Sequence, residues 1–216
     1  MNRIIKILIY SDVLILSAFS LYLPIFAIFI ATTIKGGSVA VAGLAAASYW
    51  TVRAIVQLPI SRFIDKHDGE KRSFQALILG SFLFSIVPFL FVFAELPWHI
   101  YVLQAIYALG DALAVPTYFS VFSHHIVKVK ANFQWGLRSV SIGIGIALAS
   151  AFGGYLAEIR GFDTVFIITG IVSVIGSALL IALKNHMLRP SVAKGEGGLH
   201  GKEHGGEVEE ISPLKK

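Results

Sequence analysis

The sequence predicts an all-α, polytopic membrane protein with six transmembrane helices. Its composition is the first observation: 56% of the 216 residues are hydrophobic, 14% are charged, and the mean hydropathy is +0.75. A water-soluble domain could not bury so much apolar surface. The second observation is a series of uncharged apolar runs, several of which reach the roughly 20 residues that a helix needs to cross about 30 Å of hydrocarbon. The third is that basic residues gather in alternate loops.

The six spans follow one another along the chain. We place them near residues 5–31, 38–61, 74–94, 98–122, 134–157 and 163–184. Arg3 and Lys6 precede the first span, as basic residues precede the apolar region of a signal peptide. That apolar run is too long for a signal peptide and lacks a small-residue cleavage site, so we expect a helix. The second, fourth and fifth spans reach full length if one charge is allowed inside each.

The distribution of lysine and arginine predicts the orientation. One set of alternate loops is strongly basic, whereas the opposite loops hold only Lys35 and Arg160 beside three acidic residues. By the positive-inside rule, both termini lie in the cytoplasm and the chain is integral to the cytoplasmic (inner) membrane. The basic residues of the expected cytoplasmic side are Arg3, Lys6, Arg62, Lys66, Lys71, Arg72, Lys128, Lys130, Arg138, Lys184, Arg189 and Lys194.

The chain divides into a transmembrane domain, 1–190, and a tail, 191–216. The tail is rich in Gly, Glu and Lys without apolar periodicity, so we expect it to be disordered in the cytoplasm. His200 and His204 lie in this tail and are interpreted as incidental. The absence of cysteine excludes disulfides and thiolate chemistry. We expect no cofactor and no metal, and the placement of the charges argues for membrane lipid rather than nucleic acid as the partner of this basic chain.

Two adjacent histidines, His124 and His125, make a poor metal pair because neighbouring residues point to different sides of a helix. No pattern for hydrolysis accompanies them, so an enzyme is not expected.

The stretch SRFIDKHDGEKR between the second and third spans is the most highly charged part of the membrane domain. It resembles the loop-two-three motif of the major facilitator superfamily, with Ser61 in place of the first glycine and one extra residue before the second. The resemblance implies a cytoplasmic gating loop, whose aspartate meets a helix N-terminus of the other half of the transporter. A solvated loop that only sets topology is the alternative. The matching positions are Asp65, Lys66, Gly69, Lys71 and Arg72.

Two further stretches resemble motifs of the same superfamily at the expected places. In QAIYALGDALAVP of the fourth span, Gly110 and Pro116 fit, while Gln104 and Ala108 replace an Arg and a Gly. In GIALASAFGG of the fifth span, a Gly-Pro pair of the family is replaced, which puts antiport in doubt. Its matching residues are Gly145, Gly153 and Gly154, and the replacements are Ala149 and Ser150.

The resemblance covers one six-helix half of a fold that has two, so it implies a major-facilitator half-fold that pairs as a parallel homodimer. Gly145, Ala149 and Gly153 lie four residues apart and form a small-residue ridge. We expect this ridge to meet Gly43 and Ala47 of a second protomer. Gly154 belongs to the same packing region, and Arg138 is expected to extend toward the headgroups.

Charged residues inside the spans are the best site candidates, because each costs at least about 2.5 to 3.5 kcal/mol in hydrocarbon. Asp12, Arg53 and Asp111 are expected at similar depth, and Gln104 and Tyr107 share a helix face with Asp111. One interpretation is that Asp111, with Asp12, lines a substrate or proton pathway that Arg53 tunes. The other is a permanent ion pair that fixes helix packing.

The function expected is that of a secondary transporter. It would move a small organic solute by alternating access, and proton coupling is a further hypothesis. The alternatives are a non-transporting membrane scaffold and one half of a heteromeric transporter.

Overall fold

The computed structural model describes residues 3–66 and 69–183, without the side chains of residues 69–71, and the predicted tail lies outside these ranges. Within them, six helical spans are long and apolar enough to cross a membrane, which confirms the predicted number. The helical segments are α1 (Arg3–Ser20), η1 (Leu23–Ile25), α2 (Phe26–Thr33), α3 (Val39–Lys66), α4 (Gly69–Phe91), α5 (Pro97–His125), η2 (Lys128–Lys130), α6 (Ala131–Arg160) and α7 (Phe162–Ile181).

The first span is a broken helix rather than the single helix expected at 5–31. α1 ends at Ser20, and the 3₁₀ turn that carries Pro24 leads into α2. Proline has no amide hydrogen to donate and clashes with a continuing helix, which explains the interruption. Exposed backbone of this kind is tolerated at membrane depth only where protein covers it. Here Gly153 of α6 covers it, since a Cβ at Gly153 would lie 1.9 Å from the carbonyl oxygen of Leu21.

The first three spans (α1 with α2, α3 and α4) and the last three (α5, α6 and α7) are two units that make equivalent contacts with one another. α1 packs on α6 and α7, α5 packs on α3 and α4, and α4 packs on α7 between them. Exchanging α1 with α5, α3 with α6 and α4 with α7 reproduces this pattern. Because the units start at opposite ends of the bundle, an approximate two-fold axis across the helices relates them, which is the geometry of an inverted repeat.

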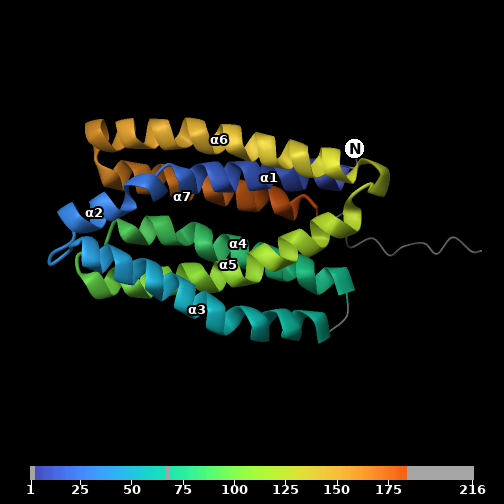
Figure 1. Ribbon diagram of the computed structural model, residues 1–216, viewed down its shortest axis with the longest axis horizontal. Helices are drawn as coiled ribbons and strands as arrows, with labels where there is room; N and C mark the ends of the chain where they lie inside the picture. The colour runs from blue at the N-terminus through green and yellow to red at the C-terminus, as the bar shows by residue number, and fades with distance from the viewer. Residues whose placement is uncertain (1–2, 67–68, 184–216) are drawn as a thin grey trace, which may run out of the picture.

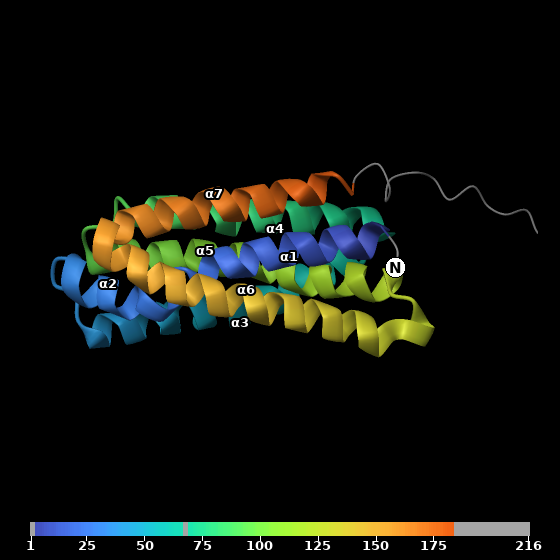
Figure 2. The ribbon, with the colours of Figure 1, turned by 90° about the horizontal axis from the view of Figure 1, so that it is seen from above.

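The spans differ in how much of their surface the bundle buries, and α3 and α6 are the least buried, peripheral ones. Figure 2 shows α4 and α7 along one side of the bundle and α3 and α6 along the other, with α1 and α5 between. Among the described residues, α3 buries Ala45 and Ile64, and α6 buries Gln134, Ile142 and Gly153. α5, by contrast, is buried along much of its length. The outer surfaces of α3 and α6 are therefore free to meet lipid or another protein.

The strongly basic loops and the loops with few basic residues lie at opposite ends of the bundle. The start of α1, the end of α3, the start of α4, η2 and the end of α7 lie together at one end, which we call the basic end (Figure 1). This end carries Arg62, Lys66, Lys128 and Lys130. The bundle therefore separates the basic loops from the others, as the sequence predicted.

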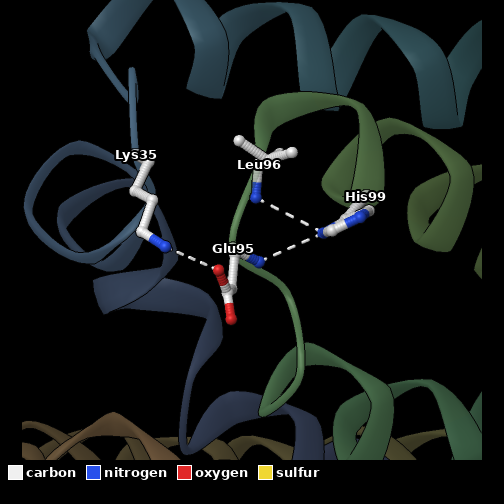
Figure 3. A network of polar contacts seen from close by, with 4 residues as sticks. All are labelled: Lys35, Glu95, Leu96 and His99. Atoms are coloured by element: carbon white, nitrogen blue, oxygen red, sulfur yellow. Dashed lines mark hydrogen bonds and ion pairs between the residues drawn. The ribbon is translucent and has the colours of Figure 1, made fainter.

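The opposite end is tied together by polar contacts between two loops. Lys35 Nζ lies 2.6 Å from Glu95 Oε2, and the Lys35 amide donates to the Glu95 carbonyl oxygen at 2.9 Å. Figure 3 shows His99 Nδ1 accepting from the amides of Glu95 and Leu96, at 3.1 and 3.3 Å. These amides precede α5, which begins at Pro97, a favoured first residue of a helix. Both loops are thus fixed to the start of α5.

Candidate solute cavity

A cavity of about 270 Å³ opens between the helices, and all six spans contribute to its wall. Its acidic and basic residues, among those that the structure describes, are Asp12, Arg53, Asp111 and Arg138. Most of the remaining wall is apolar, and it includes Ile15, Leu16, Phe19, Leu77, Phe84 and Ala114. Two carboxylates and two guanidinium groups therefore share one mainly apolar cavity.

Asp111 of α5 forms the first ion pair of the cavity. Its Oδ2 lies 2.7 Å from Arg53 Nη1 of α3 and accepts a hydrogen bond of 2.5 Å from the Tyr49 hydroxyl. Arg53 Nη1 also donates to the Tyr49 oxygen at 2.7 Å, and its Nε donates to Gln57 Oε1 at 3.1 Å. Tyr49, Arg53 and Gln57 are spaced by four residues, so they share one face of α3. The pair predicted between Arg53 and Asp111 is present.

Asp12 of α1 forms the second ion pair, with Arg138 of α6. Arg138 Nη2 lies 2.5 Å from Asp12 Oδ2, and Arg138 Nε donates to the Tyr118 oxygen at 3.2 Å. The guanidinium lies 5.0 Å from the centre of the Tyr118 ring and 5.2 Å from that of Phe119, within cation–π range. Arg138 was expected to extend toward the headgroups, and this expectation was wrong. The Asp12 carboxylate and three aromatic rings, the third being Trp135, hold its charge inside the bundle.

The two ion pairs are related by the approximate two-fold axis. The axis exchanges α1 with α5 and α3 with α6, and so exchanges Asp12 with Asp111 and Arg53 with Arg138. Each arginine lies near a tryptophan three residues before it, Trp50 at 5.3 Å and Trp135 at 5.9 Å from guanidinium carbon to ring centre. The cavity is thus built from two equivalent halves.

Sequence reasoning missed Arg138 and Tyr118 as cavity residues, although the sequence carries a signal for them. The pattern Trp-x-x-Arg occurs in both α3 and α6, at 50–53 and 135–138. An aspartate followed by an aromatic residue seven positions later occurs in both α1 and α5, at 12–19 and 111–118. A search for inverted repeats would have aligned these residues.

The expected layer of Asp12, Arg53 and Asp111 is divided into two levels. Tyr118, which contacts Arg138, lies seven residues beyond Asp111 on α5, about 10 Å closer to the basic end at 1.5 Å per residue. Asp12 therefore pairs with Arg138 at the level closer to the basic end, whereas Arg53 and Asp111 pair at the level farther from it. Of the two other predicted pathway residues, Tyr107 lines the cavity. Gln104 is half-buried on α5 and is not among the described residues of the cavity wall.

The small-residue ridge of α6 packs within the chain, which corrects its expected place between protomers. A Cβ at Gly145 would lie 2.0 Å from Ser17 Oγ of α1, and one at Gly153 would meet the Leu21 backbone. Ala149 is half-buried and packs against the core. The small residues permit close approach, as their spacing suggests, but they approach the first span of the same chain, α1 at Gly145 and the break after α1 at Gly153. Gly154 differs from Gly145 and Gly153, because a Cβ added at Gly154 would meet no atom of the described residues within 4 Å.

The predicted gating loop lies at the basic end. Asp65 and Lys66 are exposed at the end of α3, and Gly69 begins α4. The Arg72 guanidinium lies 5.6 Å from the centre of the Phe63 ring. The side chain of Lys71 lies outside the described residues.

Six membrane-length helices that line a charged, partly open cavity define a polytopic membrane protein with the architecture of a transporter. The sequence profile of the Major Facilitator Superfamily matches residues 12–212, and the chain belongs to this superfamily, whose members are secondary transporters and not enzymes.

A solved structure shows the same fold. The chain is similar to the in meso crystal structure of the POT family transporter PepTSo, with a TM-score of 0.73 and 18% sequence identity. The similarity covers 87% of this chain and 38% of that one, so this chain spans well under half the length of that transporter. A comparison with curated proteins finds no match.

Proposed function

We propose that this chain is a secondary transporter that moves a small organic solute across the cytoplasmic membrane by alternating access. The observation that carries the proposal is the placement of two ion pairs in one cavity among membrane-length helices. Each ionised group in hydrocarbon costs at least about 2.5 to 3.5 kcal/mol, so charges gathered there are best explained by a ligand that needs them.

The working unit is proposed to be a parallel homodimer with both termini in the cytoplasm. In the superfamily, the two six-helix halves are related by an axis along the membrane normal. The peripheral helices α3 and α6 have the least buried surfaces among the described spans, and they flank α1 and α5, which carry the two aspartates. A second protomer against α3 and α6 would complete the cavity. Mass measurement in lipid tests this, and a strictly monomeric protein would contradict it.

The charged loop at the basic end is proposed to act as a latch between protomers. Asp65 is exposed, as a contact to the N-terminal end of α6 of the second protomer requires. That end carries about half a positive charge from the helix dipole, so each contact contributes about 0.3 to 1 kcal/mol. In Asp65→Asn, spin-label distances between the basic ends of α3 and of the other protomer's α6 should lengthen. Unchanged distances and transport rates would leave the loop only its role in topology.

Proton coupling is proposed to use Asp111. When Asp111 takes up a proton, its attraction for Arg53 is lost, and the guanidinium becomes available to an anionic group of the solute. Tyr49, which contacts both groups, can keep a hydrogen bond to either partner during this exchange.

The alternative is a non-transporting scaffold, in which the ion pairs only fix helix packing. The two functions separate in sealed vesicles that contain the purified full chain and a panel of radiolabelled solutes. We expect exchange of at least one solute class, together with loss of that exchange in Arg53→Gln. Glu158→Gln, at an exposed site outside the cavity, serves as the control. Vesicles with folded wild-type protein that exchange no solute would favour the scaffold.

A further inference from the structure

We infer that the cavity binds a linear zwitterion, a solute with an ammonium group at one end, a carboxylate at the other and an apolar chain between. The inference rests on the proposed function, because it names the solute class of the same cavity.

The first argument is the charge balance of the cavity. Its wall, among the described residues, holds two carboxylates and two guanidinium groups in two ion pairs. When both carboxylates are ionised, a solute with net charge would leave one charge unpaired in surroundings of low dielectric, which is strongly unfavourable. A zwitterion adds no net charge: its carboxylate can share the guanidinium of one pair while its ammonium shares the carboxylate of the other. The cavity therefore favours a solute that carries both charges and no net charge.

The second argument is the separation of the two ion pairs. Asp111 marks one level of α5, and Tyr118, which binds Arg138, marks the other. Seven residues of helix separate these levels, which is about 10 Å along α5. A zwitterion whose charges are adjacent can reach one level only, whereas an extended one reaches both. A solute with charges about 10 Å apart would thus contact both ion pairs at once.

The third argument is the chemistry of the wall between the levels. Ala114 and Val115 of α5 lie between Asp111 and Tyr118, and Ile15 and Leu16 of α1 face the same cavity. These four side chains offer no hydrogen bonds, so a polar group of the solute placed against them would lose its water without compensation. An apolar chain would instead gain from burial there.

The two-fold relation of the ion pairs also supports a linear zwitterion as the solute. Each level offers one guanidinium and one carboxylate, so either end of the solute finds a partner at either level. A dicarboxylate or a diamine of the same length would find the same partners but would bring two uncompensated charges. Net charge, rather than length alone, is therefore the main basis of selection.

The test uses purified full-length protein in lipid nanodiscs and the linear amino acids H₃N⁺(CH₂)ₙCOO⁻ with n varied. Dissociation constants would be measured by thermal stabilisation, because a ligand that binds the folded state raises the unfolding temperature. The length-matched controls are the monocarboxylate, the monoamine, the dicarboxylate and the diamine.

We expect an optimum chain length at a charge separation near 10 Å, with at least about tenfold tighter binding than the best singly charged control. The double change Asp12→Asn with Arg138→Gln removes one of the two ion pairs. It should weaken binding of the best zwitterion at least about tenfold, and binding should no longer depend on chain length. The matched control is Lys35→Gln with Glu95→Gln, which removes an ion pair outside the cavity and should leave binding unchanged.

Three results would overturn the inference alone, and a fourth would overturn the proposed function with it. One is equal or tighter binding of singly or doubly charged controls, and another is binding of zwitterions without a length optimum. The third comes from the vesicle assay: exchange of other solutes but not of linear zwitterions would end the inference and leave the transporter function standing. Absence of exchange for every solute would end both.

Discussion

Arg138 of α6 lies 2.5 Å from Asp12 of α1, and this pair repeats, in the other half of an inverted repeat, the pair of Arg53 and Asp111. The repetition extends to the tryptophan three residues before each arginine. Because both pairs line one cavity, the fold places equivalent groups at two depths of the bundle. Much of the behaviour of this protein should follow from how these pairs open and close.

The pair of Asp12 and Arg138 should be strongly coupled in stability. Asp12→Asn or Arg138→Gln alone leaves an unpaired charge in the bundle, and the double variant removes both charges. We expect the two single variants together to lose more stability than the double variant loses. The difference, which is the coupling energy, should be about 0.5 to 3 kcal/mol. A double-mutant cycle from unfolding in lipid measures it. Additive effects would show that the ion pair contributes nothing beyond its separate groups.

Asp111→Asn should separate proton coupling from solute binding. Asparagine keeps the shape and a hydrogen-bond acceptor for Tyr49 but does not titrate. We expect uptake driven by a proton gradient to disappear, while exchange of solute across the vesicle membrane stays measurable. Glu158→Gln should behave as the wild type in both assays. If proton-driven uptake in Asp111→Asn is undiminished, another group carries the proton.

Adjacent glycines of α6 should differ sharply in their tolerance of a methyl group. A Cβ at Gly153 would lie 1.9 Å from the Leu21 carbonyl oxygen, whereas one at Gly154 meets no described atom within 4 Å. We expect Gly153→Ala to lower the free energy of unfolding by about 1 to 3 kcal/mol through overpacking. Gly154→Ala should be neutral or slightly stabilising, because alanine favours a helix more than glycine. Thermal unfolding of the two variants in lipid tests the close contact of α6 with the break in the first span.

The loop contact between Lys35 and Glu95 should respond to pH in a defined direction. The hydrogen bond and the charge of Lys35 hold the pKa of Glu95 below its ordinary value. A carboxylate whose pKa is lowered by folding adds stability above its unfolded pKa and loses it as the pH falls through the folded pKa. Since both side chains are exposed, the effect on stability should be small. In Lys35→Gln the pKa of Glu95 should rise, as a carbon-13 titration of the labelled side chain would show; an unchanged pKa would mean that the contact does not persist in solution.

The sequence predicts the number and order of the spans well, because membrane thickness sets helix length and hydropathy reports it directly. It also predicts the pairing of Arg53 with Asp111, since opposite charges at similar depth attract. The sequence does not show which helices touch. For that reason the sequence predicts neither the pairing of Asp12 with Arg138 nor the packing of the α6 glycine ridge within the chain. The break in the first span depends on Gly153 covering it, which is a tertiary contact that no local pattern reveals.

The central claim is that the cavity opens in turn to each side of the membrane, and the chain suits a direct measurement because it contains no cysteine. Val115→Cys places a single thiol on the cavity wall between the two ion pairs. Lys35→Cys and Lys130→Cys, at opposite ends of the bundle, define which side a membrane-impermeant thiol reagent reaches. We predict that Val115→Cys is labelled from both sides of sealed vesicles and that bound solute slows the labelling. Labelling from one side only, with no effect of any solute, would contradict alternating access.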